Sequence, residues 1–289
     1  MSAPAHLRFA PSPNGRLHRG HAYSALLNAE IARRLGGHLS LRIEDIDPVR
    51  SRPELVAAIV EDLAWLGVVW SGPVRRQSEH MADYAAARDG LAAAGLLYPC
   101  FCSRGEIRER VAAGTEPPRD PDGIPLYPGT CRGLDPAAAL VRIAAGAPHT
   151  WRLDMGRALI RAPGPHGYAA FAPDGTERWA AADPARWGDA VIARRDVPTS
   201  YHLAVVHDDA AQGITHVVRG QDLEAATDLH VLLQRLLGLP SPSYHHHGLI
   251  RDAEGEKLAK SRGSTALADL RAQGVAVAGL RAEFGFSTA

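Results

Sequence analysis

Residues 7–21, LRFAPSPNGRLHRGH, decide the fold. Leu7–Ala10 predicts a short strand that ends in a proline-rich turn, and the apolar residues of Ala22–Leu35 recur at helical spacing. Gly36–Gly37 is a typical helix stop, and the alternation of His38–Ile43 predicts a second strand. A strand, a glycine-containing turn, a helix and a second strand form the pattern of a βαβ unit in a parallel sheet.

The rest of the chain continues this alternation. We expect helices over Pro53–Leu66 and Ala82–Gly95, from Thr227 as the cap to Leu237, and in the tail from Ala266. We expect strands over Tyr201–Val206, Ile214–Arg219 and Tyr244–Ile250, and several short strands within residues 150–185. Together these patterns predict an α/β protein with a Rossmann-like, doubly wound parallel sheet.

Composition and charge narrow the class of protein. The 289 residues suffice for one main domain with an insertion or for two domains, and 46% of them are hydrophobic. Lys plus Arg and Asp plus Glu both number 32, so no overall basic excess indicates a nucleic-acid binder, and only a local basic patch stays open. The sequence shows no leader peptide and no apolar run long enough to span a membrane. We therefore expect a cytoplasmic, monomeric enzyme.

The segment His18–Arg19–Gly20–His21 predicts a phosphate-binding helix start. A helix N-terminus offers unpaired N–H groups and a positive dipole end to an anion. Gly20 allows a nucleotide to approach the backbone closely, and the imidazoles of His18 and His21 can donate hydrogen bonds to phosphate oxygens. The alternative reading is two surface histidines at the start of a helix.

A basic loop near the end of the chain, Lys257–Ser261 (KLAKS), is the second signal. A lysine side chain can neutralise the charge on a transferring phosphoryl or adenylyl group. A solvated charged loop is the alternative reading. The two signals are independent and together favour the activation of a substrate by ATP.

These two motifs resemble the nucleotide motifs of the class I aminoacyl-tRNA synthetases. The flanking segments Arg8–Gly15, Leu41–Asp47 and Val218–Leu223 are similar to the glutamyl subgroup of that family. The resemblance extends from about residue 7 to about residue 263. His21, where short relatives often have serine, and Ala259 in the lysine loop depart from the pattern.

The resemblance implies a fold, a reaction and a partner. Only residues 262–289 follow Ser261, whereas an ordinary glutamyl-tRNA synthetase continues with a long anticodon-binding region. The layout therefore resembles the short glutamyl-Q type, which modifies a tRNA base instead of the 3′ end. This implies activation of glutamate by ATP to glutamyl-adenylate and transfer of glutamate to queuosine in the anticodon stem-loop of tRNA(Asp). We expect this activation to be independent of tRNA.

The same resemblance implies roles for individual residues. Those that contact glutamate are Arg8, Phe9, Ala10, Pro11, Ser12, Glu44, Tyr201 and Arg219. Those that bind ATP are Pro11, His18, Gly20, His21, Lys257, Lys260 and Ser261. Among them, His18, His21 and Lys260 are the catalytic residues. Mg²⁺ is expected to accompany the ATP. Asp222 and His202 are weaker candidates for a supporting role.

Residue chemistry is compatible with this pocket, and the resemblance favours it over the alternative given below. Arginine binds a carboxylate through a planar, bidentate fork. Arg8 and Arg219 are expected near the carboxyl ends of two strands, where ligands collect in an open parallel sheet. Glu44 can hold the ammonium group, and Tyr201 can add a hydroxyl. The alternative is a structural ion pair between Arg8 and Glu44 on neighbouring strands.

Three cysteines lie in a segment, Tyr98–Gly133, that is rich in proline and glycine. An odd number of clustered cysteines argues against a disulfide framework and favours a structural Zn²⁺ site, which needs four ligands. Cys100, Cys102 and Cys131 supply three thiolates. The resemblance implies Tyr127 as the fourth ligand; water, Glu106 and Asp122 are the alternatives, and three idle thiols are the other reading.

The implied domain plan has four parts. Residues 1–97 and 186–250 form the two halves of the catalytic domain, 98–185 an inserted zinc-binding and acceptor-type subdomain, and 251–289 the lysine loop and a helical tail, with no anticodon-binding domain. Candidate contacts to the tRNA backbone are Arg75, Arg76, Arg194 and Arg195.

Three other functions stay open from the sequence. One is a truncated synthetase that charges a tRNA 3′ end. The second is an adenylyltransferase or small-molecule ligase, because His-x-Gly-His also occurs there. The third is a non-catalytic, zinc-bearing RNA-binding module.

Overall fold

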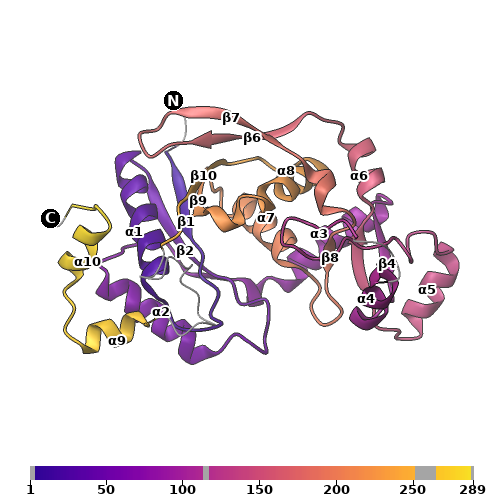
Figure 1. Cartoon of the computed structure of the whole chain (residues 1–289), viewed down its shortest axis with the longest axis horizontal. Helices are drawn as coiled ribbons and strands as arrows, with labels where there is room; N and C mark the ends of the chain where they lie inside the picture. Colours follow the sequence, from indigo (N-terminus) through magenta and orange to yellow (C-terminus); the bar gives the residue numbers. More distant parts are fainter. Residues whose placement is uncertain (1–3, 113–116, 251–264, 288–289) are drawn as a thin grey trace.

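Strands and helices alternate along most of the chain, as the sequence predicts (Figure 1). The computed structural model describes residues 4–112, 117–250 and 265–287. The strands are β1 (His6–Phe9), β2 (His38–Ile43), β3 (Arg75–Arg76), β4 (Leu97–Cys100), β5 (Thr150–Leu153), β6 (His166–Phe171), β7 (Glu177–Ala182), β8 (Val191–Ala193), β9 (His216–Gly220) and β10 (Ser243–His247). The helices are α1 (Arg19–Arg34), α2 (Pro53–Trp65), α3 (Met81–Ala93), α4 (Arg104–Ala112), α5 (Pro136–Ala144), α6 (Met155–Arg161), α7 (Tyr201–Ala211), α8 (Ala226–Leu237), α9 (Leu267–Ala272) and α10 (Val277–Glu283).

The main sheet has the strand order β3-β2-β1-β9-β10-β6-β7. All neighbours in it are parallel except β6 and β7, which form an antiparallel hairpin. The predicted α/β fold with a mostly parallel central sheet is therefore confirmed.

The order of strands creates a switch point between β1 and β9. From β1 the chain moves outward through β2 to β3, whereas from β9 it moves in the opposite direction to β10. Leu7 of β1 pairs with His216 of β9, although the two are far apart in the sequence. Ligands of open α/β sheets bind in the crevice outside the carboxyl ends of strands at such a point.

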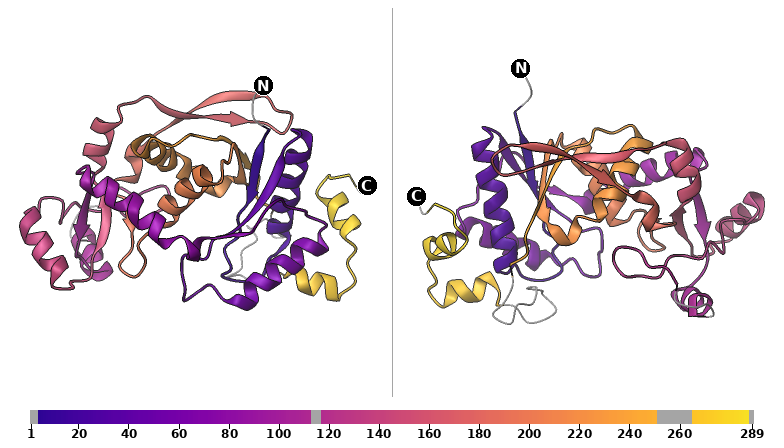
Figure 2. Two further views of the ribbon diagram at one scale, coloured as in Figure 1. Left: turned by 180° about the vertical axis from the view of Figure 1, so that it is seen from behind. Right: turned by 45° about the horizontal axis from the view of Figure 1, so that its top comes forward.

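Apolar residues of α1, α2, β1 and β2 form the first core of the molecule. Helix α1 ends at the expected glycines: Gly36 has φ +60°, and a side chain on Gly37 would collide with the carbonyl oxygen of Ala5. The C-terminal helices α9 and α10 lie beside α1 and α2 and add Leu267, Leu270 and Leu280 to this core (Figure 2). A second core joins α3, α6, α7 and α8 to β4 and β5.

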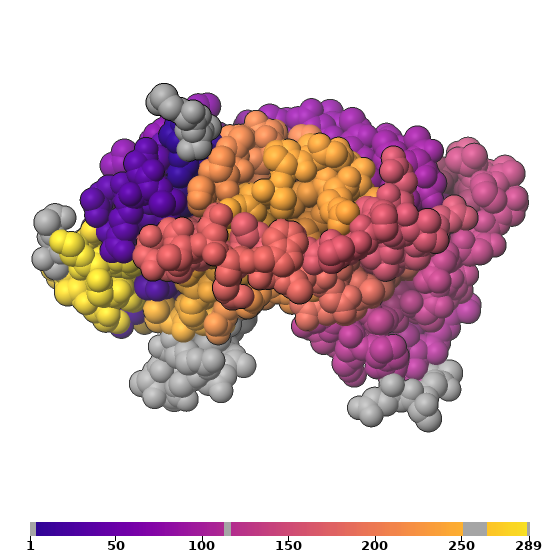
Figure 3. All heavy atoms as spheres, turned by 90° about the horizontal axis from the view of Figure 1, so that it is seen from above, coloured from indigo at the N-terminus to yellow at the C-terminus, as the bar shows by residue number. Residues whose placement is uncertain are grey.

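Residues 98–185 contribute to two different sheets. Strands β4 and β5 form an antiparallel three-stranded sheet with β8. The β6–β7 hairpin extends the main sheet, and Figure 3 shows it as a band along one face of the molecule. The domain boundaries themselves stay a prediction.

One predicted strand is wrong. Residues Tyr201–Ala211 form helix α7, not a strand over Tyr201–Val206. The hydroxyl oxygen of Ser200 accepts a hydrogen bond from the Leu203 N–H and caps this helix. A short apolar run fits a buried strand and a buried helix equally well. The capping residue Ser200 and the polar residues after Val206 are the features that favour a helix here.

The predicted cap of helix α8 is also wrong. The helix begins at Ala226 with Ala225 as its N-cap residue, and no side chain caps it. Thr227 is fully buried and bonds to side chains of the pocket described below. The other predicted elements are present with ends shifted by a few residues. No helix in the described part of the chain is long and apolar enough to cross a membrane.

Candidate active site

A pocket of about 870 Å³ lies at the β1–β9 switch point. This volume is within the range of small-molecule sites. The residues that line it are Arg8, Phe9, Ala10, Pro11, Ser12, Asn14, His18, Gly20, His21, Ser24, Glu44, Arg50, Tyr201, Val218, Arg219, Gly220, Asp222, Leu223, His247, Leu249 and Ile250. All predicted glutamate and ATP residues that the structure describes are thus brought together.

The pocket draws its charged side chains from three neighbouring strands. Arg8 is the penultimate residue of β1, Arg219 is the penultimate residue of β9, and Glu44 follows β2 directly. The strand order β2-β1-β9 places these three carboxyl ends side by side. Tyr201 joins them from the first turn of α7.

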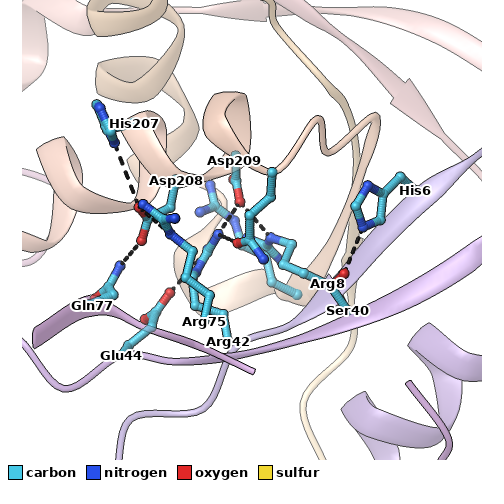
Figure 4. A network of polar contacts seen from close by, with 12 residues as sticks. His6, Arg8, Ser40, Arg42, Glu44, Arg75, Gln77, His207, Asp208 and Asp209 are labelled. Atoms are coloured by element: carbon cyan, nitrogen blue, oxygen red, sulfur yellow. Dashed lines mark hydrogen bonds and ion pairs between the residues drawn. The ribbon is translucent and has the colours of Figure 1, made fainter. Parts of the chain in front are cut away.

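A buried carboxylate of α7, Asp209, positions Arg8 (Figure 4). Its Oδ1 accepts hydrogen bonds from Arg8 Nε at 2.9 Å and from Arg42 Nη1 at 2.7 Å. Burial by itself would raise the pKa of Asp209, but the guanidinium groups of Arg8 and Arg42 outweigh it and hold this pKa below its usual range. Arg8 therefore pairs with Asp209 and not with Glu44, so the alternative ion pair is not the one observed.

Glu44 accepts a hydrogen bond from Arg42 Nη2 at 3.3 Å. Burial raises the pKa of Glu44, against the opposing pull of Arg42 and Arg8. A cationic ligand group beside Glu44 would favour its charged form. The carboxylate is thus placed to receive an ammonium group.

The neighbouring residue of α7, Asp208, anchors a second set of side chains (Figure 4). Its oxygens accept hydrogen bonds from Arg75 Nε, Gln77 Nε2 and the Tyr84 hydroxyl. The pKa of Asp208 is lowered to about 2, because hydrogen bonds and nearby arginines outweigh its burial. This network joins α7 to β3 and α3 beside the Asp209 network, and none of its residues lines the pocket.

Arg219 is 5% exposed and has a different environment. Its Nη2 donates to Thr227 Oγ1 at 2.8 Å, and its Nη1 lies 3.4 Å from the Tyr201 hydroxyl oxygen and 3.3 Å from His230 Nδ1. Its Nε lies 3.4 Å from His246 Nε2. Among the described residues, no carboxylate lies within ion-pair distance of Arg219, so none of them neutralises its charge directly.

The two motif histidines cap helix α1. His18 is the N-cap residue, and its Nδ1 accepts a hydrogen bond from the Gly20 N–H at 3.1 Å. The Nδ1 of His21 accepts from the His18 N–H at 3.2 Å. Since a neutral imidazole carries its proton on the other nitrogen, both rings have an Nε2–H donor. A side chain on Gly20 would press on the His18 ring.

Lys257, Lys260 and Ser261 lie outside the described residues. Before that segment, Ile250 lines the pocket; after it, Ala266 forms a backbone bridge with His18. The Leu267 N–H also donates to the Leu17 carbonyl oxygen.

The structure adds residues that sequence reasoning missed. Asn14, Ser24, Arg50 and His247 line the pocket, and Asp209 holds Arg8. The sequence signal for Asp209 is the pair of aspartates at 208–209. Their burial could have been predicted only if this segment had been assigned as a helix, which places them on its buried side. Of the weaker candidates, Asp222 lines the pocket, whereas His202 does not.

The four arginines considered for tRNA contacts all have protein partners. Arg75 pairs with Asp208, Arg76 with Asp45, and Arg194 with Asp47 and Asp196. Arg195 donates to backbone carbonyl oxygens of Phe101 and Cys102. These contacts give each arginine a structural role.

The three cysteines converge in the insertion, where their Sγ atoms lie within 4.8 Å of one another. Cys102 Sγ and Cys131 Sγ are 3.5 Å apart, too far for a disulfide but close to the edge, about 3.8 Å, of a tetrahedron of thiolates around zinc. The Tyr127 hydroxyl lies 3.3 Å from Cys100 Sγ and 3.6 Å from Cys102 Sγ. Glu106 is engaged elsewhere, because it accepts from the Ser103 N–H. The donor set fits a tetrahedral zinc ion.

Comparison with known proteins identifies the class to which this fold and pocket belong. A family model described as tRNA synthetases class I (E and Q), catalytic domain, matches residues 4–278. A crystal structure of a glutamate tRNA ligase from Elizabethkingia meningosepticum, in complex with its amino acid, superposes with a TM-score of 0.72 and is 28% identical. The match covers 90% of this chain and 53% of that chain, so this chain spans about half the ligase.

Curated relatives are closer in length. A glutamyl-Q tRNA(Asp) synthetase from Rhodobacter capsulatus is 46% identical, over 96% of this chain and 99% of the relative. One from Symbiobacterium thermophilum is 41% identical, over 92% of this chain and 81% of the relative. The chain therefore belongs to the class I tRNA synthetase family for E and Q and, within it, to the glutamyl-Q tRNA(Asp) synthetases, a family of ligases.

Proposed function

We propose that this enzyme activates glutamate with ATP and transfers the glutamyl group to queuosine in the anticodon of tRNA(Asp). The observation that carries the proposal is the pair of opposite charges in one pocket: Arg219 for the side-chain carboxylate of glutamate and Glu44 for its ammonium group. The names of the relatives support the same substrates.

In the first step, an oxygen of the glutamate α-carboxylate attacks the α-phosphorus of ATP. The bond between this phosphorus and the pyrophosphate oxygen breaks, and glutamyl-adenylate forms. The Nε2–H groups of His18 and His21 hold the phosphates beside the positive dipole end of α1, whose Gly20 N–H is bonded to His18 Nδ1. Magnesium bound with ATP would neutralise phosphate charge, and Lys260 is proposed for the same task from the sequence alone.

In the second step, a hydroxyl of the queuosine cyclopentene-diol attacks the carbonyl carbon of glutamyl-adenylate. The hydroxyl loses its proton, the new ester bond forms and AMP leaves. Here the protein acts by positioning, because both reacting groups must meet in the same pocket. The target base must leave its stack to reach the site.

Zinc and assembly complete the proposal. Zn²⁺ held by Cys100, Cys102, Tyr127 and Cys131 would stabilise the small buried cluster that these residues form with Tyr98 and Ile107. We further propose a monomer that works in the cytoplasm on the anticodon stem-loop of tRNA(Asp).

Glutamate-dependent exchange between ATP and pyrophosphate tests the first step. We expect exchange with glutamate and a loss of at least about 100-fold in kcat/KM in Arg219→Ala, because the carboxylate loses its counter-charge. The exposed Arg161→Ala variant serves as a matched control. No exchange with glutamate, with or without tRNA, contradicts the proposal.

Acceptor assays test the second step. We expect stable glutamylation of tRNA(Asp) that carries queuosine and none of tRNA(Asp) that lacks it. One rival function is charging of a tRNA 3′ end, which the likeness to a glutamate tRNA ligase favours. Stable product on tRNA(Glu) without queuosine would support that rival.

A further inference from the structure

The partners of Arg219 share one chemical property. They are Thr227, Tyr201, His230 and His246, and none of them carries a negative charge. The other arginine that lines the pocket close by, Arg8, donates to Asp209 instead. Of these two buried guanidinium groups in one pocket, Arg8 is held by a carboxylate and Arg219 by uncharged partners.

Hydrogen-bond roles around Arg219 follow from what a guanidinium can do. It only donates, so His230 Nδ1 must accept, and the His230 proton resides on Nε2. This Nε2 lies 3.2 Å from His202 Nδ1 and donates to it. The rings of His202 and His230 therefore each need only one proton. A second proton on His230, at Nδ1, would abolish its hydrogen bond with Arg219.

The second histidine follows the same logic. His246 Nε2 lies 3.4 Å from Arg219 Nε and 3.0 Å from Thr227 Oγ1. Thr227 accepts from Arg219 and so has its own proton to give to His246. His246 Nε2 is therefore an acceptor on both sides, which requires the neutral ring.

Burial and charge keep these rings neutral. Burial and, after it, the guanidinium of Arg219 lower the pKa of His202 to about 4 and that of His246 to about 3. The same two causes hold the pKa of His230 well below its ordinary value. Near neutral pH, Arg219 thus carries the net charge of this cluster.

We infer that Thr227, His230 and His246 form a neutral cradle that fixes Arg219 without cancelling its charge, and that this cradle determines the preference for glutamate over glutamine. The inference rests on the proposed function. A carboxylate in the cradle would have positioned Arg219 equally well, but it would have removed the attraction for an anionic side chain. A glutamine side chain gains less from an uncompensated charge, because its amide oxygen can accept a hydrogen bond from Arg219 but carries no net charge.

A matched pair of variants separates charge from shape. His230→Asn keeps a neutral acceptor near the position of Nδ1. His230→Asp introduces a side chain of the same shape as asparagine that carries a negative charge. Exchange between ATP and pyrophosphate is measured with glutamate and with glutamine on the full chain, with kcat and KM determined separately. The Asn variant should keep the preference of the wild type and a glutamate KM within about threefold.

The Asp variant should lower the glutamate-to-glutamine ratio of kcat/KM by at least about tenfold. The loss should lie mainly in the glutamate KM, while the KM for ATP stays unchanged. His166→Asp is the control, because His166 Nδ1 lies 3.2 Å from Arg235 Nη1 in a similar contact outside the pocket. It should leave the ratio unchanged.

Several results would overturn the inference. A folded His230→Asp variant with the wild-type ratio does so, as does an Asn variant as impaired as the Asp variant. Equal effects of His166→Asp and His230→Asp also contradict it. If His230→Asp does not fold, Thr227→Asp places a carboxylate beside Arg219 Nη2 instead. The glutamate-to-glutamine ratio of kcat/KM then tests the inference in that variant. No exchange by the wild type contradicts the proposed function itself, which is a distinct result.

Discussion

Asp62 of α2 is a buried acid without a hydrogen-bond partner among the described residues, whereas Asp208 and Asp209 near the pocket are bonded to arginines. It is 1% exposed, and neither carboxylate oxygen has a hydrogen-bond partner in the described part of the chain. Burial raises the pKa of Asp62, although Arg271 and Arg16 oppose the shift. An acid of this kind costs folding free energy when it is ionised.

We expect Asp62→Asn to raise the free energy of unfolding at pH 7 by roughly 1 kcal/mol, because the buried charge is removed. Since the folded-state pKa of Asp62 is raised, the folded state binds the proton more tightly. The wild type therefore loses stability as the pH rises from the ordinary carboxyl pKa through the folded-state value.

Urea unfolding between pH 4 and pH 8 tests this expectation. The advantage of Asp62→Asn should shrink toward pH 4, because the raised pKa of Asp62 favours protonation of the wild-type carboxyl as the pH falls. The exposed Asp83→Asn variant should stay within about 0.5 kcal/mol of the wild type at each pH. An advantage for Asp62→Asn that does not change with pH would refute the argument.

At the scale of elements, local patterns predicted most of the structure. The βαβ unit of β1, α1 and β2 follows from apolar spacing and the glycine stop, both of which depend on neighbours in the chain. Helix α7 was missed because the same local information is ambiguous for a short apolar run. Its assignment depends on packing against α3 and α8, which spacing alone does not reveal.

The insertion offers a test of its proposed metal. We expect about one zinc per chain, lost in Cys100→Ser and Cys131→Ser, with a lower melting temperature because the bound metal would no longer link the three cysteines of the insertion. Zinc is measured by elemental analysis on purified protein. Unchanged zinc in both variants contradicts the site.

A pair of tyrosine variants tests the fourth ligand. Tyr127→Phe should weaken zinc retention against a chelator. Tyr98→Phe should not, because the Tyr98 hydroxyl bonds to Asp189 instead of the cysteines. Equal retention in both variants would show that another group takes the fourth position.

At the scale of the whole molecule, the candidate site was predictable only in part. Strand ends in a parallel sheet predicted that Arg8, Glu44 and Arg219 would meet, and the pocket contains all three. The groups that hold them, Asp209 and His230, were not predicted. Their contacts depend on how α7 and α8 pack on the sheet, and no short motif records that arrangement.

The C-terminal helices are integral to the first core. Leu280 of α10 is 1% exposed, and Arg271 of α9 pairs with Glu61 of α2. We expect Leu280→Ala to lower the free energy of unfolding by about 2–4 kcal/mol through lost burial and a cavity. Leu140→Ala on α5, where the side chain is 63% exposed, should cost less than about 0.5 kcal/mol. Chemical denaturation measures both; equal, small effects would contradict the packing.

The pairing of β1 with β9 bears on the order of events during synthesis on the ribosome. Arg8 is made 201 residues before the Asp209 that holds it, and Arg219 is made later still. A nascent chain can therefore display the proposed nucleotide-binding turn long before the proposed glutamate pocket is complete. Substrates can stabilise only the finished chain, so they cannot rescue one that stalls midway.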